Sequence, residues 1–257
     1  MPRLKSGSCT VKAVTNLRQY NGPDSFEPRQ LPLRSLERPR GDVVHLWHLD
    51  FNALSNPLNP DAHAMDMSVA RQRAVRRFYL RLLLGAYLDL PGKDVHIKRR
   101  IKGRPELDSI QSKGELNFSV ARSNACYLIG VSGGADIGVD LEVATRRTGK
   151  PMALARRYFS QDETAALSAF SDSVLQHAFM HTWSCKEAIV KASGVGIANQ
   201  LCRFSVDVDP ARPPAVLSMQ DDDPGAWCLT MAQPSAGAIA AVALRQQSIR
   251  LECFSLS

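Results

Sequence analysis

One short segment places two carboxylates where they can act together. Residues 138–142 have the sequence Gly-Val-Asp-Leu-Glu, which is typical of a β-strand. Side chains alternate between the two faces of a strand, so Asp140 and Glu142 would point the same way, roughly 7 Å apart. The segment therefore predicts one acidic, oxygen-rich edge.

A second segment, which begins 41 residues after Glu142, adds a third carboxylate and an amine. Residues 183–194 predict a helix that ends at a Ser-Gly pair, with Glu187 and Lys191 four residues apart on one face. Three carboxylates that converge would repel one another unless a hard cation lay between them, and Mg²⁺ is usually held by carboxylates together with substrate phosphates. Lys191 could stabilise a phosphate or protonate a leaving group. We therefore predict metal-assisted phosphoryl or phosphodiester transfer.

Each motif also has an ordinary structural interpretation. An Asp-x-Glu pair is most often a solvated strand face, and a Glu/Lys pair at this spacing is most often a solubilising helix pair. The flanking sequence favours the functional interpretation, because Asp140 and Glu142 end the apolar run 137–139, and Trp183 and the apolar stretch 188–190 predict that the helix is partly buried. Charges at the rim of buried elements need partners.

These motifs resemble those of the Sfp-type 4'-phosphopantetheinyl transferases. The family has a G-[IV]-D-x-E strand followed, after about 40 residues, by W-x-x-K-E-A-x-x-K, and both motifs are present here without a gap. Three weaker matches precede them in the family's order: an opening strand at 43–47, Gly-Arg-Pro at 103–105 and Asn-Phe-Ser at 117–119. The resemblance covers roughly residues 41–245.

The resemblance implies a reaction and a role for each acidic residue. The enzyme would transfer the 4'-phosphopantetheine arm of coenzyme A to a serine of an apo acyl or peptidyl carrier protein and release 3',5'-ADP. Asp140, Glu142 and Glu187 would hold Mg²⁺, with Mn²⁺ as an alternative ion. Asp140 and Glu187 would be catalytic, and Glu187 would take the proton of the carrier serine. Lys191 would neutralise or protonate the departing phosphate.

Coenzyme A carries several phosphates, so the resemblance also implies a set of cationic and polar ligands. By motif position these are Arg104 and Ser119, joined by Lys191, and Arg71 and Arg77 follow from the helical region. Any single arginine of this helix could instead belong to a solvated face. Surplus positive charge would also suit the acidic recognition helix of a carrier protein.

Two features depart from the family pattern. Relatives usually have a histidine after the Asn-x-Ser serine, where this chain has Val120, which cannot donate a hydrogen bond to a phosphate. We expect weaker binding of coenzyme A or the use of Arg122 instead. The arginine cluster at 76–77 also runs directly into the helix at 79–83, as though a loop were shortened, which leaves the assignment of Arg71 and Arg77 open.

The resemblance implies an α+β fold of two similar halves related by a pseudo-twofold axis, each a small, mainly antiparallel sheet packed with helices. We predict a flexible N-terminal extension at 1–40, an N-terminal half with the basic coenzyme A zone at 41–137 and a C-terminal half with the metal-binding carboxylates at 138–257. Residues 132–134 predict a hairpin turn. Predicted helices span 68–90, 151–170 and 175–193; predicted strands span 43–49, 95–104, 116–120, 125–131, 137–143, 204–208, 216–219, 227–231 and 238–244.

The charge distribution and the lengths of the apolar runs limit which partners and which cellular location fit the sequence. The net charge is +7, yet residues 1–40 carry +5 and residues 71–104 carry +9, so the basic charge is concentrated. No nucleic-acid-binding motif accompanies it, so we expect no nucleic-acid partner. No apolar run reaches a membrane-spanning length and residues 1–40 lack a signal-like apolar core, so we expect a cytoplasmic protein without a membrane partner. A two-half chain can build the site alone, which favours a monomer.

Two other functions fit the same residues. A metal-dependent phosphohydrolase would use these carboxylates with water as the nucleophile. A degenerate relative could instead bind a carrier protein or nucleic acid without catalysis. The sequence leaves open which carrier protein or pathway the enzyme serves and what residues 1–40 do. The cysteines are scattered singly without metal-ligand spacing, and the acidic neighbour of Cys185 disfavours a thiolate nucleophile there.

Overall fold

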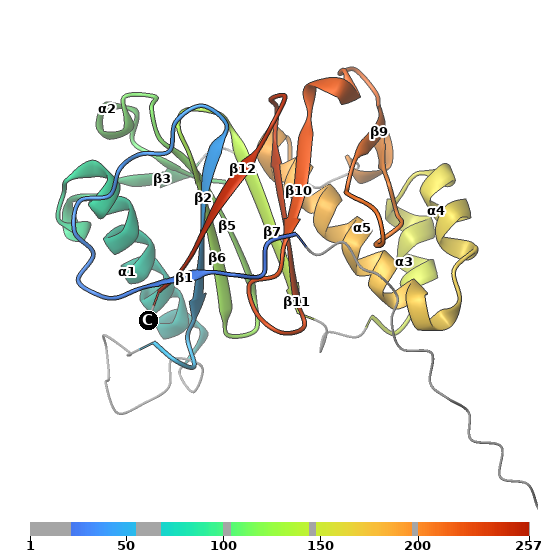
Figure 1. Cartoon of the computed structure of the whole chain (residues 1–257), viewed down its shortest axis with the longest axis horizontal. Coiled ribbons are helices and arrows are strands. Elements are labelled where there is room, and N and C mark those ends of the chain that lie inside the picture. The colour runs from blue at the N-terminus through green and yellow to red at the C-terminus, as the bar shows by residue number, and fades with distance from the viewer. Residues whose placement is uncertain (1–21, 55–67, 100–103, 144–147, 197–199, 257) are drawn as a thin grey trace, which may run out of the picture.

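The computed structural model of the chain describes residues 22–54, 68–99, 104–143, 148–196 and 200–256. Residues 1–21 of the predicted extension and Gly103 of the Gly-Arg-Pro motif lie outside these segments. The strands form the middle of the molecule, with α1 on one side and α3, α4 and α5 on the other (Figure 1). The predicted α+β fold class is confirmed. In the described segments, no helix combines the length and the apolar character needed to cross a bilayer.

The first half consists of a strand, a long helix, a two-stranded ribbon and a hairpin. Its elements are β2 (Val43–Asp50), α1 (Val69–Leu88), the 3-10 turn η2 (Gly92–Asp94), β3 (Ile97–Arg99), β4 (Pro105–Leu107), α2 (Ser109–Ser112), β5 (Asn117–Ser123) and β6 (Cys126–Ser132). β6 lies between β2 and β5 and is antiparallel to both. Ser68 caps α1, because its side chain accepts a hydrogen bond from the N–H of Arg71.

The second half repeats this order. Its elements are β7 (Ile137–Val143), α3 (Pro151–Tyr158), α4 (Gln161–Ser168), α5 (Asp172–Ser193), the 3-10 turn η3 (Leu201–Arg203), β8 (Phe204–Val206), β9 (Val216–Met219), the 3-10 turn η4 (Pro224–Ala226), β10 (Cys228–Ala232) and β11 (Ala238–Leu244). β11 lies between β7 and β10 and is antiparallel to both, as β6 is to β2 and β5. Apart from the added helices α3 and α4, the two halves therefore share one order of elements and of strands.

The two ends of the chain depart from the predicted division. The C-terminal strand β12 (Arg250–Leu256), which was not predicted, pairs in parallel with β2 and so extends the first sheet. β1 (Glu27–Arg29) pairs in parallel with the other edge of β12, and Leu33 and Leu36 pack against the core of the first half. The segment 250–256 thus belongs with the first half, and the described part of the predicted extension is attached to it.

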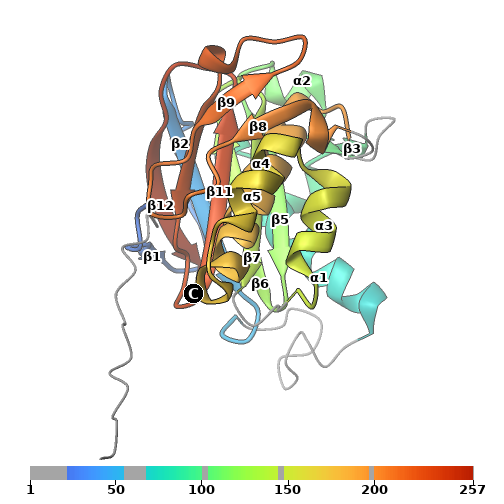
Figure 2. The ribbon, with the colours of Figure 1, turned by 90° about the vertical axis from the view of Figure 1, so that its right-hand side faces the viewer.

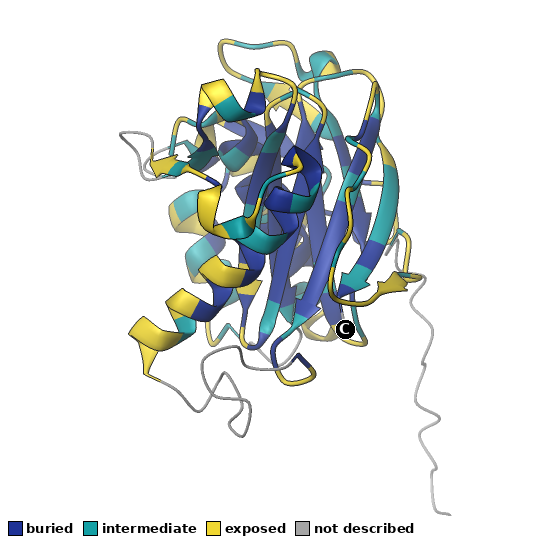
Figure 3. Cartoon of the chain, turned by 90° about the vertical axis from the view of Figure 1, so that its left-hand side faces the viewer, coloured by how far each residue is buried: buried dark blue, intermediate teal, exposed yellow. Residues whose placement is uncertain are grey.

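The helix α5 lies directly against β7 and β11 (Figure 2). The close approach depends on Gly138, because a Cβ at this position would lie 1.9 Å from the carbonyl oxygen of Ala188 and 2.5 Å from the nitrogen of Ala192. By alternation along β7, Asp140 lies on the same face as Gly138, towards α5. The core strands are almost wholly buried, whereas the helices keep an exposed outer face (Figure 3).

The predicted hairpin at 132–134 is wrong. Both edges of β6 are already occupied, by β2 and β5, so β7 cannot pair there and joins β11 in another sheet. β7 instead packs its side chains across β6, where a Cβ on Gly130 would lie 2.5 Å from a methyl carbon of Val139. The Ser-Gly-Gly segment therefore carries the chain from one sheet to the next.

The predicted helix 151–170 is two helices, α3 and α4. Ser160 ends the first and caps the second: its Oγ accepts from the N–H of Glu163, and the Glu163 carboxylate accepts from the N–H of Ser160. This reciprocal capping box starts a new helix in its own direction. Its Ser-x-x-Glu pattern was present in the sequence and would have located the break.

Candidate active site

The strand and helix motifs meet at Asp140 and Lys191. The Lys191 ammonium lies 2.7 Å from Oδ1 of Asp140 and donates to the carbonyl oxygen of Val139 at 3.0 Å. Lys191 sits in the last turn of α5, and Asp140 lies in the middle of β7. The side chains of this pair are 28% and 11% exposed, so a solute can reach the ion pair from one side.

The three predicted metal ligands are all buried. Asp140, Glu142 and Glu187 are 8%, 4% and 6% exposed. The second carboxylate oxygen of Asp140, Oδ2, is buried and has no hydrogen-bond partner among the residues described, and such an oxygen is a natural ligand position for a hard cation. Within the described segments, however, no three or more His, Cys, Asp or Glu side chains are grouped as a complete metal site.

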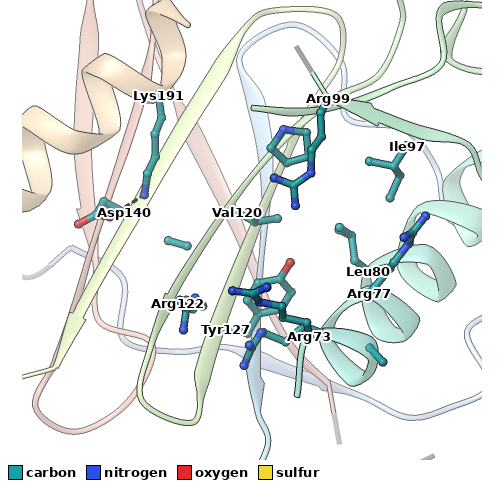
Figure 4. Close-up of a pocket in the computed structure, with 14 residues that line it drawn as sticks. Arg73, Arg77, Leu80, Ile97, Arg99, Val120, Arg122, Tyr127, Asp140 and Lys191 are labelled. Atoms are coloured by element: carbon teal, nitrogen blue, oxygen red, sulfur yellow. Dashed lines mark hydrogen bonds and ion pairs between the residues drawn. The ribbon is translucent and has the colours of Figure 1, made fainter. Parts of the chain in front are cut away.

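A cavity opens beside the ion pair. Its volume of about 890 Å³ is that of a typical ligand pocket. It lies between α1, the β3–β4 ribbon and β5 of the first half and β7 and α5 of the second (Figure 4). The residues that line it are Arg73, Ala74, Arg76, Arg77, Leu80, Ile97, Arg99, Pro105, Val120, Ala121, Arg122, Tyr127, Asp140 and Lys191. Both halves of one chain therefore contribute to its wall.

The arginines of the cavity are not neutralised by acidic side chains. None of Arg73, Arg76, Arg77, Arg99 and Arg122 forms an ion pair with a carboxylate among the residues that the structure describes. Burial, followed by the Arg122 guanidinium, lowers the pKa of Arg76, while Tyr127 opposes the shift. Like charges held together at such a cost indicate a binding site for an anion.

Tyr127 lies within this group of arginines. Burial raises the pKa of its phenol, with Arg76 and Arg122 opposing the shift, so the hydroxyl remains protonated at neutral pH. Tyr127, Arg76 and Arg122 all line the cavity, and Figure 4 shows Tyr127 beside Arg73 and Arg122 on the side of the cavity away from Lys191. A neutral donor among cations suits recognition of phosphate oxygens.

Of the predicted coenzyme A ligands, Arg77 and Lys191 line the cavity and the other three do not. Arg71 is exposed at the first turn of α1. The Arg104 guanidinium donates to the carbonyl oxygens of Ala192 and Ile137, at 3.2 and 3.0 Å. The buried Ser119 hydroxyl accepts from the N–H of Val139 at 3.1 Å. Both Arg104 and Ser119 thus bind the second half of the same chain.

The structure adds cavity residues that the sequence did not single out as ligands: Arg73, Arg76 and Arg99. The helical period gives part of the signal, since Arg73, Arg76, Arg77 and Leu80 recur at spacings of three and four residues and so share one face of α1. Arg122 was expected as a substitute for the family histidine. It lies two residues beyond Val120 on β5, on the same face, and both line the cavity.

The lysine that precedes Glu187 has a different role. Lys186 is completely buried, and its ammonium binds the two carboxylate oxygens of Glu163 at 2.7 and 2.8 Å, the carbonyl oxygen of Phe204 and the face of the Phe204 ring. Glu163 also accepts the N–H of Val206 at 2.9 Å. This pair fastens α5 to α4 and β8, and so fixes the helix that carries Glu187 and Lys191.

Cys185 is also completely buried, with its thiol 3.7 Å from the sulfur of Met231. Burial, followed by the charge of Asp140, raises the pKa of this thiol. Because the thiolate is the nucleophilic form, the environment suits a packing residue, in line with the prediction.

Comparisons with known proteins show which proteins the chain resembles. A family model described as the 4'-phosphopantetheinyl transferase superfamily matches residues 136–243, which span β7 to β11. The 4'-phosphopantetheinyl transferase HetI of Nostoc sp. (strain PCC 7120) is 30% identical over 216 residues, which cover 79% of this chain and 88% of HetI. The 4'-phosphopantetheinyl transferase Sfp of Bacillus subtilis is 25% identical over 201 residues, covering 67% of this chain and 86% of Sfp.

Among solved structures, a holo-(acyl-carrier-protein) synthase from Bacillus anthracis aligns with part of this chain. The alignment covers 44% of this chain and 96% of the synthase chain, at 22% identity and a TM-score of 0.35. The match to HetI spans both halves, from the basic zone to the carboxylate motifs, so the chain belongs to the 4'-phosphopantetheinyl transferase superfamily. The predicted family is confirmed, and the protein is a transferase.

Proposed function

We propose that the protein transfers the 4'-phosphopantetheine arm of coenzyme A to a serine hydroxyl of an apo acyl or peptidyl carrier protein and releases 3',5'-ADP. The observation that carries the proposal is one cavity that combines the Asp140–Lys191 pair with five guanidiniums that have no acidic partner in the described part of the chain. Coenzyme A presents a pyrophosphate and a separate 3'-phosphate, and arginine forks match phosphate oxygens. The position of the cavity between the two halves supports the predicted division of labour, with basic ligands from the first half and carboxylates from the second.

The chemistry divides between Glu187 and Lys191. The serine oxygen would attack the phosphorus that bears the pantetheine arm, a new phosphorus–oxygen bond would form, and the bond to the bridging pyrophosphate oxygen would break. Glu187, directly or through water, would accept the serine proton. Lys191 would then neutralise the 5'-phosphate of the departing 3',5'-ADP, a role for which its contact with Asp140 holds the ammonium at the cavity wall.

Asp140, Glu142 and Glu187 are the residues that would hold Mg²⁺, or Mn²⁺ in its place. The unpartnered Oδ2 of Asp140 and the burial of all three carboxylates fit a hard cation. Because the described side chains form no complete site, the protein would supply only part of the coordination shell, and Mg²⁺ is commonly bound by one or two carboxylates and substrate phosphates. When bound, the ion would offset the charge that develops on the pyrophosphate.

Two more features of the proposal concern partners. One chain supplies both walls of the cavity, which supports action as a monomer. The concentrated basic charge would suit an acidic carrier protein, and we expect no nucleic acid or membrane in the reaction. That Arg71, Arg104 and Ser119 bind coenzyme A stays a prediction from the sequence, and the backbone contacts of Arg104 and Ser119 favour a structural role for these two.

The decisive experiment is incubation of the protein with coenzyme A, Mg²⁺ and a panel of apo carrier proteins, with mass spectrometry of the carriers. We expect the mass of the transferred arm on at least one carrier and loss of the signal with EDTA. Lys191→Met and Asp140→Asn should each reduce turnover by about 100- to 1000-fold: the first removes the cation that would neutralise the leaving phosphate, and the second removes a proposed metal ligand and the contact that holds Lys191. Hydrolysis of coenzyme A without a carrier would instead identify a phosphohydrolase, and the absence of both products would identify a non-catalytic relative.

A further inference from the structure

We infer that Arg104 is a positioning residue, which holds the end of α5 on the start of β7 so that Lys191 meets Asp140. The inference concerns a residue that the sequence pattern assigned to coenzyme A binding. Its consequence for turnover rests on the proposed function, whereas its structural part does not.

The contacts of Arg104 join the two halves. It lies just before β4 of the first half, and its two terminal nitrogens donate to Ala192 O on α5 and Ile137 O on β7, with Asp136 Oδ1 at 3.5 Å. The side chain is only 14% exposed. The last carbonyl groups of a helix lack partners within the helix and carry partial negative charge, so a guanidinium is well suited to bind there.

The two carbonyl groups that Arg104 binds lie next to the reacting pair. Ala192 directly follows Lys191, and Ile137 directly precedes Gly138, whose missing side chain lets α5 approach β7. A shift of the α5 terminus along β7 would therefore move the Lys191 ammonium relative to Asp140, whose present separation is 2.7 Å. Arg104 bridges the two backbones at the point where their separation sets this distance.

Ser119 makes a second tie of the same kind. Its hydroxyl, on β5 of the first half, accepts the N–H of Val139, which lies next to Asp140. The first half thus binds the backbone of β7 at residues 137 and 139, on either side of Gly138. Arg104 and Ser119 are both outside the cavity lining, in contrast to Arg99 on the neighbouring strand β3.

The test compares Arg104→Met, Arg104→Lys and Arg99→Gln by amide hydrogen exchange of the free protein. Loss of the two donated hydrogen bonds should speed exchange in residues 188–194 by about 10-fold in Arg104→Met. Arg104→Lys keeps a charge but not the two-pronged contact, so it should show a smaller increase. Arg99→Gln removes a cavity guanidinium and no contact with α5, so its exchange there should equal that of the wild type. Unchanged exchange in both Arg104 variants would overturn the inference.

Kinetics and binding then separate positioning from phosphate binding. For Arg104→Met we expect kcat with an apo carrier protein to fall by about 100-fold, the cost of a misplacement of about 1 Å, while the Kd for 3',5'-ADP by calorimetry changes less than about 2-fold. A Kd that rises as much as in Arg99→Gln, with normal kcat, would show that Arg104 binds phosphate and would overturn the positioning role. A wild-type protein without transfer activity would refute the proposed function, and the exchange data would still decide the structural part.

Discussion

The two halves of the molecule share one order of strands and helices but treat charge in opposite ways. On α1 of the first half, Arg73, Arg76 and Arg77 line the cavity without carboxylate partners among the described residues. On α5 of the second half, Lys186 is buried and bound by both carboxylate oxygens of Glu163. The long helix of the first half therefore carries cations that can bind a ligand, whereas the long helix of the second half carries a buried cation that stabilises the fold.

This difference separates binding from support. Burial first, and then the charges of Arg122 and Arg73, lower the pKa of Arg76, and a bound anion would offset both the burial and the repulsion. A buried ion pair costs about as much in desolvation as it returns, but removal of one partner leaves a bare charge. Mutation of Lys186 on α5 should consequently affect stability, whereas mutation of the cavity arginines on α1 should affect ligand affinity.

The largest expected effect is on stability, from Lys186→Met. It leaves the Glu163 carboxylate buried without its counterion, so the free energy of unfolding should fall by about 3–5 kcal/mol. Urea denaturation followed by circular dichroism measures this change.

A double variant separates the effect of the uncompensated charge from the effect of the changed side-chain volume. In Lys186→Met combined with Glu163→Gln the uncompensated charge is gone, and the glutamine oxygen can still accept the N–H of Val206, so part of the stability should return. A loss below about 1 kcal/mol in the single variant would contradict the framework role of the pair.

Much of the fold followed from local sequence patterns, and what did not depends on tertiary pairing. The helix at α1 and the strand at β7 were predicted because the periodicity of apolar residues is a local signal. The partner of β7 was not, since nothing in the Ser-Gly-Gly segment shows that both edges of β6 are occupied. The position of β12 was equally hidden, because its partner β2 lies about two hundred residues earlier in the chain.

The candidate site shows the same limit. The sequence predicted that the strand with Asp140 and the helix with Lys191 lie at one site, but it did not predict the ion pair that these two side chains form with each other. The predicted metal set of Asp140, Glu142 and Glu187 remains a prediction. The sequence was less informative about the arginines. It does not distinguish an arginine exposed to solvent from one that binds phosphate, or from one that binds backbone carbonyl groups as Arg104 does, until the neighbouring groups are known.

The next effect in size is on ligand affinity. Arg122→Gln and Arg76→Gln should each weaken binding of 3',5'-ADP by about 10- to 100-fold, the value of a charge-assisted hydrogen bond. Neither should lower the free energy of unfolding, because each relieves repulsion among like charges. Isothermal titration calorimetry gives the affinity, and it should weaken further with added salt.

Arg212→Gln is the matched control, since Arg212 is paired with Asp207 and Asp209 on the surface. It should leave the Kd unchanged and hardly alter stability, because solvent screens this surface pair. If Arg122→Gln destabilised the protein while it bound 3',5'-ADP normally, the assignment of the arginine cluster to a ligand would be wrong, and the contrast between the two helices would disappear.

The smallest expected effect is the pH dependence of the α5 framework, which contains His181. Burial lowers the pKa of this imidazole from 6.5 to about 4, His177 adds to the shift, and Asp207 and Asp209 oppose it. Between these pKa values the unfolded chain binds more protons than the folded one, so this contribution to stability is complete above about pH 6.5 and declines as the pH falls towards 4. Urea titrations at about pH 7 and about pH 5.5 should differ by roughly 1 kcal/mol from this group, and His181→Gln should remove that difference. An unchanged pH slope in His181→Gln would show that the imidazole is not held neutral by burial in α5.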